Sequence, residues 1–206
     1  ILNSVGTHLT GLTLDSSAGN NHAKNTDGFD LSHNKGVHIT NNVIHNQDDC
    51  LAMQSSVDTV FSGNSCTGGH GISVGSIGRD VVDESSTVSG LIVDNNKIID
   101  SDNGLRIKTI SDKKGLVTGV SYTKNVLTNV KNAIVIHSNY VDDGFKGNPT
   151  SQVTIRNITI AGLSGTATNL YDILVNPSVV SDWHFSGITV SGAKGKCEGQ
   201  PSSITC

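Results

Sequence analysis

Residues 27–31 read DGFDL, and the same arrangement of residue types recurs four more times along the chain. Each copy has a polar residue, a small residue and then an apolar, variable, apolar run that suits a short β-strand. The other copies are DCLAM at 49–53, HGISV at 70–74, NGLRI at 103–107 and NAIVI at 132–136. Because the copies align without gaps, we interpret them as equivalent strands of a repeating structure.

A second pattern lies between these copies, an apolar alternation that closes on asparagine. Its five copies are VHITNN at 37–42, VFSGN at 60–64, LIVDNN at 91–96, VSYTKN at 120–125 and VTIRN at 153–157. The closing residues are Asn42, Asn64, Asn96, Asn125 and Asn157, at intervals of 22, 32, 29 and 32 residues. We expect these asparagines to occupy one corner, adopt left-handed backbone conformations and hydrogen-bond to one another along the stack.

Short strands in such a repeat, without helical periodicity, predict an all-β parallel β-helix, or β-solenoid. Inward Val, Ile and Leu side chains would form its core. The alternative is a β-sandwich, whose two-residue hairpin turns are few in this chain. The 206 residues include 23 Gly, 3 Pro and 35% hydrophobic residues, which is too hydrophobic for a disordered chain. We expect one domain over residues 1–206.

Charge and hydropathy exclude two classes of partner. The net charge of −4 argues against a protein that binds nucleic acid by broad phosphate neutralisation. No apolar run reaches membrane-spanning length, and no basic segment followed by an apolar one opens the chain. Ile1 already lies in a strand pattern, so we expect a processed or truncated N-terminus.

The four cysteines, Cys50, Cys66, Cys197 and Cys206, indicate disulfides rather than metal. There is no Cys-x-x-Cys and no histidine at zinc-finger spacing, so a zinc site is not expected. The simplest pairing joins the first two and the last two, although four cysteines allow three pairings. Disulfides indicate an oxidising compartment, and the sequon at Asn157 agrees with a secreted glycoprotein.

Stacking the repeats would bring charged residues together. Asp27, Asp49 and His70 would share one column on consecutive coils, with Asp48 beside Asp49. Adjacent parallel strands lie about 4.8 Å apart, so the four groups would cluster within roughly 10 Å. Crowding separates the pKa values of carboxyl groups, which suits glycosidic hydrolysis, where one acid must be protonated and another ionised.

Two cations follow the same column. Arg106 and Lys108 are two residues apart, so their side chains leave one strand on one face, one coil beyond His70. The alternative for this pair is an ordinary solvated strand face. Its position next to the acidic column favours a role in holding an acidic ligand.

These residues resemble a known family. NTDGFD at 25–30, NQDDC at 46–50, GGHGIS at 68–73 and RIK at 106–108 look like the four motifs of the polygalacturonases, the pectin-hydrolysing glycoside hydrolases of family 28. The resemblance runs from about Leu14 to Cys206 and is closest to secreted endo-acting enzymes of fungi and some plant-feeding insects. It implies a right-handed parallel β-helix and hydrolysis of α-1,4-linked polygalacturonate with inversion.

The resemblance also implies roles. Asp48 matches the general acid, Asp27 and Asp49 the pair that activates water, and His70 the histidine that tunes or orients the acid. Arg106 and Lys108 match ligands of the substrate carboxylate. Tyr140 matches a substrate-binding tyrosine after RIK, although His137-Ser138-Asn139 departs from the acidic and amide residues expected before it. Asn25 is a further substrate-binding candidate.

Other expectations follow from the resemblance. It implies no cofactor and no metal, pectin as substrate, plant inhibitor proteins as candidate partners, a monomer and secretion. Relatives carry more N-terminal coils and a helical cap, so the chain is similar to the C-terminal part of a catalytic domain. A third cysteine pair often found in relatives is missing around Val179 to Trp183.

Three alternatives stay open. A calcium-dependent pectate lyase also uses a parallel β-helix and aspartates, but needs a cation and an Arg or Lys base. A solenoid without catalysis would bind acidic polysaccharide alone. Exo action would require a blocked end of the cleft, which depends on loops such as 75–89.

Overall fold

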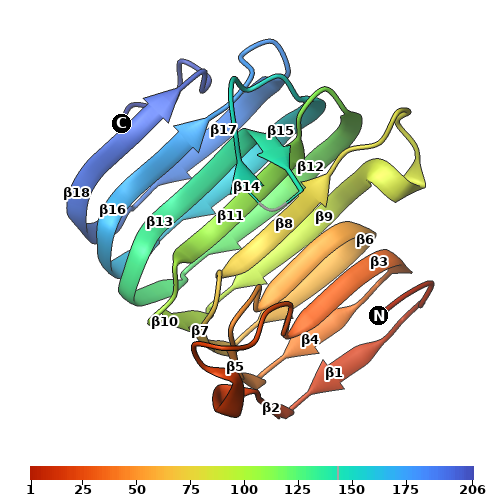
Figure 1. Ribbon diagram of the computed structural model, residues 1–206, viewed down its shortest axis with the longest axis vertical. Coiled ribbons are helices and arrows are strands. Elements are labelled where there is room, and N and C mark those ends of the chain that lie inside the picture. Colours follow the sequence, from red (N-terminus) through yellow and green to blue (C-terminus); the bar gives the residue numbers. More distant parts are fainter. Residues whose placement is uncertain (143) are drawn as a thin grey trace.

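The computed structural model describes residues 1–142 and 144–206. In this part of the chain, eighteen strands form a right-handed parallel β-helix whose coils stack along one axis (Figure 1). The strands are β1 (His8–Thr10), β2 (Thr13–Asp15), β3 (Phe29–Lys35), β4 (His38–Thr40), β5 (Val43–Asn46), β6 (Leu51–Ser62), β7 (Ser65–Gly68), β8 (Ile72–Ile77), β9 (Thr87–Asp94), β10 (Lys97–Ile99), β11 (Asn103–Ile110), β12 (Lys114–Thr123), β13 (Val126–Val141), β14 (Gly144–Phe145), β15 (Gln152–Ala161), β16 (Ser164–Leu174), β17 (Val180–Ser186) and β18 (Thr189–Glu198).

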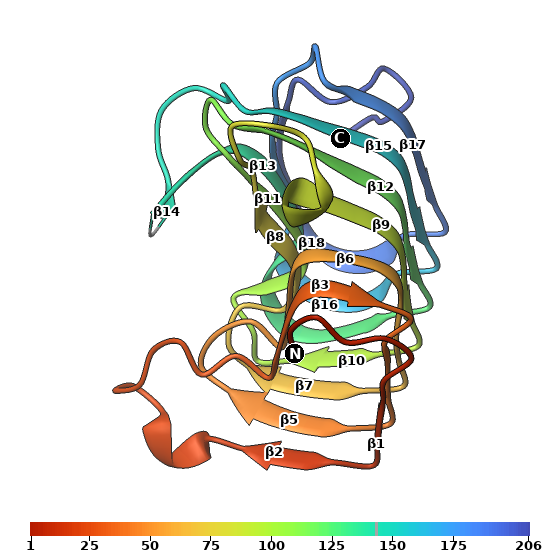
Figure 2. The ribbon, with the colours of Figure 1, turned by 90° about the vertical axis from the view of Figure 1, so that its right-hand side faces the viewer.

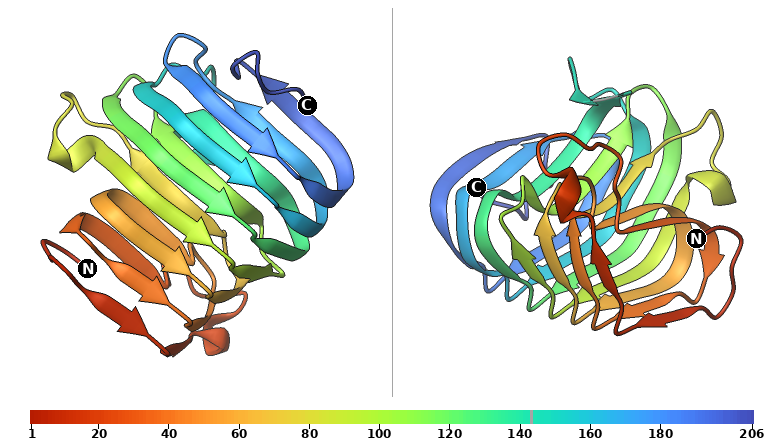
Figure 3. Two further views of the ribbon diagram at one scale, coloured as in Figure 1. Left: turned by 180° about the vertical axis from the view of Figure 1, so that it is seen from behind. Right: turned by 60° about the horizontal axis from the view of Figure 1, so that its bottom comes forward.

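Each coil crosses three faces, and the chain ends lie at opposite ends of the stack (Figure 3). The first face stacks β3, the start of β6, β8, β11, and the later parts of β13, β16 and β18. The second face stacks β4, the end of β6, β9, β12, β15 and β17. The third face stacks β2, β5, β7, β10 and the start of β13. Parallel pairing between coils rules out the hairpin-based sandwich.

The register of the first face confirms the alignment of the five repeats. One inward column contains the third residue of every copy, Phe29, Leu51, Ile72, Leu105 and Ile134. The column continues to Tyr171, so a sixth copy, NLYDI at 169–173, follows the five found by pattern. Side chains alternate across a strand, so the residues between these core positions point outward.

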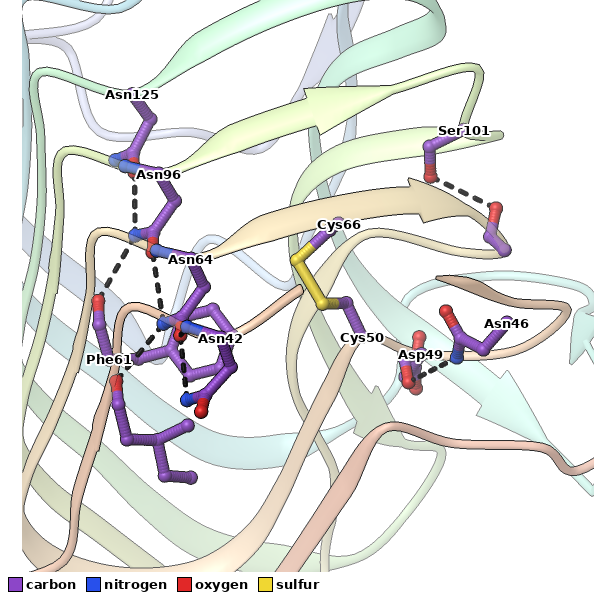
Figure 4. Close-up of a disulfide and its surroundings, with 12 residues drawn as sticks. Asn42, Asn46, Asp49, Cys50, Phe61, Asn64, Cys66, Asn96, Ser101 and Asn125 are labelled. Carbon is purple, nitrogen blue, oxygen red and sulfur yellow. Dashed lines mark hydrogen bonds between the residues drawn. A yellow bond between two sulfur atoms is a disulfide. The ribbon is translucent and has the colours of Figure 1, made fainter. Parts of the chain in front are cut away.

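An asparagine ladder runs along the corner between the second and third faces (Figure 4). The backbone N–H groups of Asn42, Asn64 and Asn96 each donate to the side-chain Oδ1 of the next ladder asparagine, at 2.9, 2.9 and 3.0 Å. All ladder asparagines, Asn125 included, are buried. The left-handed conformation falls on the residue before each of them, for example Asn41 and Asn95, rather than on the ladder asparagine itself.

The ladder ends at Asn125, so the expected fifth member was wrong. Leu163 occupies the next ladder position, because Val126 pairs with Ser164 and Leu163 precedes that residue. The fifth copy of the second pattern is therefore ITIAGL at 158–163, not VTIRN at 153–157. Asn157 lies instead at an exposed position within β15, beside Gly119, with φ of 53°. This exposure is compatible with its sequon.

Stacked aliphatic side chains fill the inside of the coil. Leu31, Met53, Ile107 and Ile136 are among the residues almost fully removed from solvent, and Trp183 is buried near the C-terminal end. Burial of one large aliphatic side chain stabilises the fold by about 1.5 to 3 kcal/mol.

The two disulfides have the pairing that we expected as the simplest. Cys50 is joined to Cys66 between consecutive coils, and Cys197 is joined to Cys206 after the last strand. The first of them lies next to Asp49, because Cys50 directly follows Asp49 in the chain (Figure 4).

The helical content of the described chain is confined to two short 3-10 turns, η1 (Ser17–Gly19) and η2 (Glu84–Ser86). Within these residues, no helix has the length and apolar character needed to cross a membrane.

Candidate active site

The predicted acidic column lies where the third face turns into the first face. Asp27 ends the loop before β3, Asp48 and Asp49 lie between β5 and β6, and His70 lies between β7 and β8. One ligand atom from each of Asp48, Asp49 and His70 lies within 4.8 Å of the others. The sequence-predicted cluster is therefore assembled by stacking residues from consecutive coils.

Glycines make the close approach at His70 feasible. Gly69 and Gly71 have φ of 60° and 87°, a left-handed region that residues with a Cβ rarely adopt. A Cβ at Gly69 would lie 2.0 Å from the Asp48 carbonyl oxygen, and one at Gly71 would lie 2.1 Å from the Asn103 carbonyl oxygen. The glycines that flank His70 thus let its backbone pack directly on the neighbouring coils.

Asp48 is held as a carboxylate. Its Oδ1 accepts hydrogen bonds from the backbone N–H of Asp49 at 2.8 Å and from His70 Nδ1 at 2.9 Å. Its Oδ2 accepts from the backbone N–H of Asn25 at 3.2 Å. The hydrogen bond from His70 is the main reason that the pKa of Asp48 falls to about 2. Reciprocally, Asp48 raises the pKa of His70.

Asp49 is the centre of a buried ionic network. Its Oδ1 accepts from Ser73 Oγ at 2.7 Å and from Arg106 Nη2 at 2.6 Å, and its Oδ2 accepts from Lys108 Nζ at 2.8 Å. Asp49 is 1% exposed, and Arg106 and Lys108 are each 8% exposed. Both oxygens of Asp49 therefore accept hydrogen bonds from cations or a hydroxyl, and its expected role in activating water stays a prediction.

Strand geometry explains how these cations reach Asp49. Ser73 and Arg106 are paired on β8 and β11, and they point outward because their neighbours Ile72 and Leu105 fill the core. Lys108 follows on the same face of β11. The outward alternation predicted for Arg106 and Lys108 is confirmed. Their main partner is Asp49.

Asp27 differs from Asp48 in its electrostatic surroundings. Burial, followed by the negative charges of Asp48, Asp30 and Asp49 in that order, raises the pKa of Asp27 to about 7. Burial is also the main cause of the raised pKa of Asp30, a fourth carboxyl group that points outward from β3. The site thus holds two neighbouring carboxyl groups with widely separated pKa values.

Asp48, His70, Arg106 and Lys108 border a cavity of about 550 Å³, whereas Asp27 and Asp49 are not among its lining residues. Its walls are two loops that project from the same side of the solenoid, residues 16–28 before β3 and the hairpin of β13 and β14 (Figure 2). The lining residues are Ala23, Lys24, Asn25, Gln47, Asp48, His70, Arg106, Lys108, Tyr140, Asp142, Gly144 and Phe145. The structure therefore brings Asn25 and Tyr140 to the same cavity as Asp48 and His70, two of the four predicted catalytic residues.

Tyr140 lies next to Lys108. The Lys108 Nζ atom is 5.4 Å from the centre of the Tyr140 ring, and the Tyr140 hydroxyl donates to the Asp142 carbonyl at 2.8 Å. Phe145 contacts Tyr140 edge-on at 5.7 Å between ring centres. An aromatic wall thus borders the cationic end of the cavity.

A second cavity of about 500 Å³ adjoins the first, and His70 and Gln47 line both. It continues over the turns towards Asp100 and Asp102. Loop 75–89, which we considered as a block to one end of the cleft, contributes no residue to either cavity among those that the structure describes. A long substrate therefore has room on both sides of the Asp48–His70 pair.

Several residues of the site were missed in the sequence. Asn46, directly before the QDD run, is buried, and its Nδ2 donates to the Asp49 carbonyl oxygen at 2.9 Å (Figure 4). The same Nδ2 donates to the Asp48 carbonyl oxygen, also at 2.9 Å. Ser73 binds Asp49, and Thr26 and Gln47 join the two acidic loops. The one available signal was position, because Thr26 and Gln47 each precede an acidic motif residue.

The donor set does not suit a divalent cation, although Asp48, Asp49 and His70 have the spacing for one. Arg106 and Lys108 already lie within hydrogen-bond distance of Asp49, and they would repel a second positive charge. The Asp48 carboxylate already accepts hydrogen bonds from three donors.

Known proteins share both the sequence and the fold. Endopolygalacturonase I of Aspergillus oryzae is 45% identical over 207 residues, covering 97% of this chain and 55% of the relative. Among solved structures, endopolygalacturonase I from Stereum purpureum, complexed with two galacturonate, has a TM-score of 0.73 at 32% identity and covers 93% of this chain and 57% of the other. Endo-xylogalacturonan hydrolase from Aspergillus tubingensis has a TM-score of 0.81 at 28% identity, covering 98% and 58%.

The match extends along the whole sequence. Residues 1–206 match Glycosyl hydrolases family 28, while the chain spans about half the length of the curated relatives it matches. With the stacked motifs and the sequence identity in agreement, the chain belongs to glycosyl hydrolase family 28.

Proposed function

We propose that this chain carries the catalytic centre of an enzyme that hydrolyses α-1,4 bonds inside polygalacturonate, with inversion at the anomeric carbon. The observation that carries the proposal is the Asp48–His70 pair beside the buried Asp49–Arg106–Lys108 network, on the wall of one cavity. The named endopolygalacturonase relatives and the galacturonate complex of the fungal structure support it.

Asp48 delivers the proton to the leaving oxygen in this proposal. In the free protein Asp48 is ionised, and the proton lies on His70 Nδ1, 2.9 Å away. A developing charge on the leaving oxygen draws a proton from Asp48, which His70 supplies along the same hydrogen bond. His70 is therefore needed both to orient Asp48 and to supply its proton.

Asp27 is the base on the opposite side of the bond. An inverting enzyme needs a second carboxylate that activates water, with the two carboxyl groups about 6.5 to 9.5 Å apart. The pKa of Asp27 is raised to about 7, so the free site in mildly acidic solution holds a proton on this group. Activity requires its ionisation, and we expect kcat/KM to increase as the pH rises towards 7.

Arg106 and Lys108 hold the galacturonate carboxylate. Within the described residues, Arg106 Nε donates to Ser73 and Arg106 Nη2 donates to Asp49. We therefore assign Nη1 as the nitrogen that donates to the substrate carboxylate. Asp49 fixes both cations rather than acting as a base, because its two oxygens already accept from them. Tyr140 supplies an aromatic wall beside Lys108.

Two measurements test this proposal. With polygalacturonate as substrate, viscosity should fall much faster than reducing ends appear, because internal cleavage shortens chains early. NMR of the first product should show the β-anomer, since inversion converts an α-linkage. Release of monomer without an early loss of viscosity would contradict internal cleavage. Initial release of the α-anomer would contradict inversion.

The same assays separate the alternatives. A lyase would form unsaturated, ultraviolet-absorbing products and lose activity in EDTA, whereas a binding module would retain pectate without releasing reducing ends. Xylogalacturonan should be included as a substrate because of the solved hydrolase of similar fold. The two cations on Asp49 favour hydrolysis over calcium-dependent elimination.

We further propose that the protein is a secreted monomer that acts on pectin outside the cell. Two disulfides and the exposed Asn157 sequon support an oxidising, extracellular setting. Plant inhibitor proteins remain candidate partners.

A further inference from the structure

Thr26 and Gln47 form a reciprocal contact between the two acidic loops. The backbone N–H of Gln47 donates to Thr26 Oγ1 at 2.9 Å, and the Thr26 hydroxyl donates to Gln47 Oε1 at 3.0 Å. The hydroxyl group thus acts as acceptor and donor at once, which no aliphatic side chain of this size can do. Thr26 directly precedes Asp27, and Gln47 directly precedes Asp48.

Gln47 also anchors the far end of the same loop. Its Nε2 donates to the Ser16 carbonyl at 2.9 Å and to Asn20 Oδ1 at 2.7 Å. Every polar atom of the Gln47 side chain is therefore used to hold residues 16–28 against the coil of Asp48. A Cβ at Gly19 would lie 2.9 Å from Gln47 Oε1, so the loop packs tightly on this amide.

The contact matters because the sheet does not extend to these residues. Regular pairing of the two coils begins at Phe29 and Leu51, after the acidic residues. The loops before those strands are therefore aligned by local hydrogen bonds, including Gly28 N–H to the Asp49 carbonyl at 2.9 Å. A small displacement of a reacting group can reduce a rate by about 10²-fold.

We propose that Thr26 and Gln47 are positioning residues that set the separation between the Asp27 and Asp48 carboxyl groups. The inference rests on the proposed inverting hydrolysis, in which that separation must leave room for one water. It assigns a task to two residues that touch neither the leaving oxygen nor the substrate carboxylate in that mechanism.

The test compares Thr26→Val with Thr26→Ser. Valine has nearly the same shape but loses both hydrogen bonds, whereas serine keeps the hydroxyl. We expect Thr26→Val to lower kcat on polygalacturonate at least tenfold, with KM within twofold because Arg106 and Lys108 are unchanged. Thr26→Ser should recover kcat to within threefold of the parent. Gln47→Glu keeps the acceptor but loses both Nε2 donors, and should also lower kcat.

Thr40→Val is the matched control. Thr40 Oγ1 donates to Thr10 Oγ1 at 3.2 Å, so it joins two consecutive coils through β1 and β4 on the second face, outside the acidic corner. Removing the Thr40 hydroxyl should leave kcat within twofold of the parent. Equal losses of kcat in Thr26→Val and Thr40→Val would show a general effect on stability and would overturn the proposal.

A second readout does not depend on catalysis. Asp27 faces the charges of Asp48, Asp30 and Asp49. If Thr26→Val lets Asp27 move away from them, its pKa should fall, as followed by carbon NMR of the Asp27 carboxyl group. Thr40→Val should leave this titration unchanged. An inactive parent would overturn the proposed function alone, because the titration would still test the positioning. An unchanged titration and kcat in folded Thr26→Val would overturn the positioning.

Discussion

The two polar corners of this solenoid use stacking in opposite ways. At the corner between the second and third faces, buried asparagines from consecutive coils hydrogen-bond to one another in a continuous ladder (Figure 4). At the corner between the third and first faces, carboxyl groups from consecutive coils face one another and need a histidine and two cations as partners.

The difference shows what repetition does to a side chain. An amide carries both a donor and an acceptor, so a column of identical amides satisfies itself. A carboxylate only accepts. Burial and the neighbouring carboxylates therefore raise the pKa of Asp27, and Asp49 requires two cations as partners. The asparagine corner therefore stabilises the coil, whereas the acidic corner gathers ionisable groups that can act in catalysis.

The largest expected effect comes from the acidic corner. Asp48→Asn removes the proposed proton donor with little change in volume, and general acids typically contribute about 10²- to 10⁴-fold in rate. We expect kcat to fall by at least 10²-fold, while circular dichroism and the thermal midpoint stay close to those of the parent. A kcat within threefold of the parent would remove Asp48 from its role.

The next effect combines stability and substrate binding. Arg106→Ala leaves the buried Asp49 with Lys108 as its remaining cation, and breaking a buried pair costs about 3 kcal/mol or more. We expect a lower free energy of unfolding in urea and at least a tenfold loss of kcat/KM on polygalacturonate. Methyl-esterified pectin should show a much smaller loss of kcat/KM, because it lacks the charge that Arg106 binds.

Arg156→Ala is the control for this prediction, since Arg156 is exposed on β15. It should change stability by less than about 0.5 kcal/mol. Equal losses of kcat/KM by Arg106→Ala on esterified and unesterified polymer would show that Arg106 does not bind the substrate carboxylate.

The ladder corner should respond in stability alone. Asn64→Ala removes the side-chain acceptor of the backbone N–H of Asn42 and the side-chain donor to the Ile39 carbonyl oxygen, and each buried unsatisfied group costs about 1 to 3 kcal/mol. We expect a loss of about 2 kcal/mol or more in urea unfolding, with kcat unchanged in the folded fraction. The exposed Asn148→Ala should have almost no effect on stability. A large loss of kcat in folded Asn64→Ala would mean that the two corners are coupled.

The smallest expected effect is a change in how stability depends on pH. The pKa of Asp27 is raised in the folded state to about 7 from 3.8, so between these values the folded state binds more protons and loses stability as pH rises. Asp27→Asn removes this penalty, so its thermal midpoint at pH 8 should exceed that of the parent. At pH 3 the two midpoints should be closer. Equal midpoints at pH 8 would show that Asp27 is not destabilised when ionised.

Repeat alignment predicted most of the first face because the pattern there has no interruption. The copies at Asp27, Asp49 and His70 are short, equally phased and apolar at matching positions, and their pairing in the structure follows that phase. The prediction failed at Asn157, because Leu163 occupies the ladder position and an asparagine follows a similar apolar alternation six residues before it. A stacked column such as the asparagine ladder can be predicted from the sequence only over the coils that keep the same residue type at that position.

By itself, the sequence determined the β-helix, its register and the residues that meet at the acidic corner, because a strand period of two and a repeat of coils constrain which side chains share a face. Only the tertiary structure decided how those residues interact. Asp49 turns onto Arg106 and Lys108, which are 57 and 59 residues away in the chain, and Asp48 turns to His70. These directions depend on loop conformations and on partners from other coils, and the separation of the Asp27 and Asp48 pKa values follows from them.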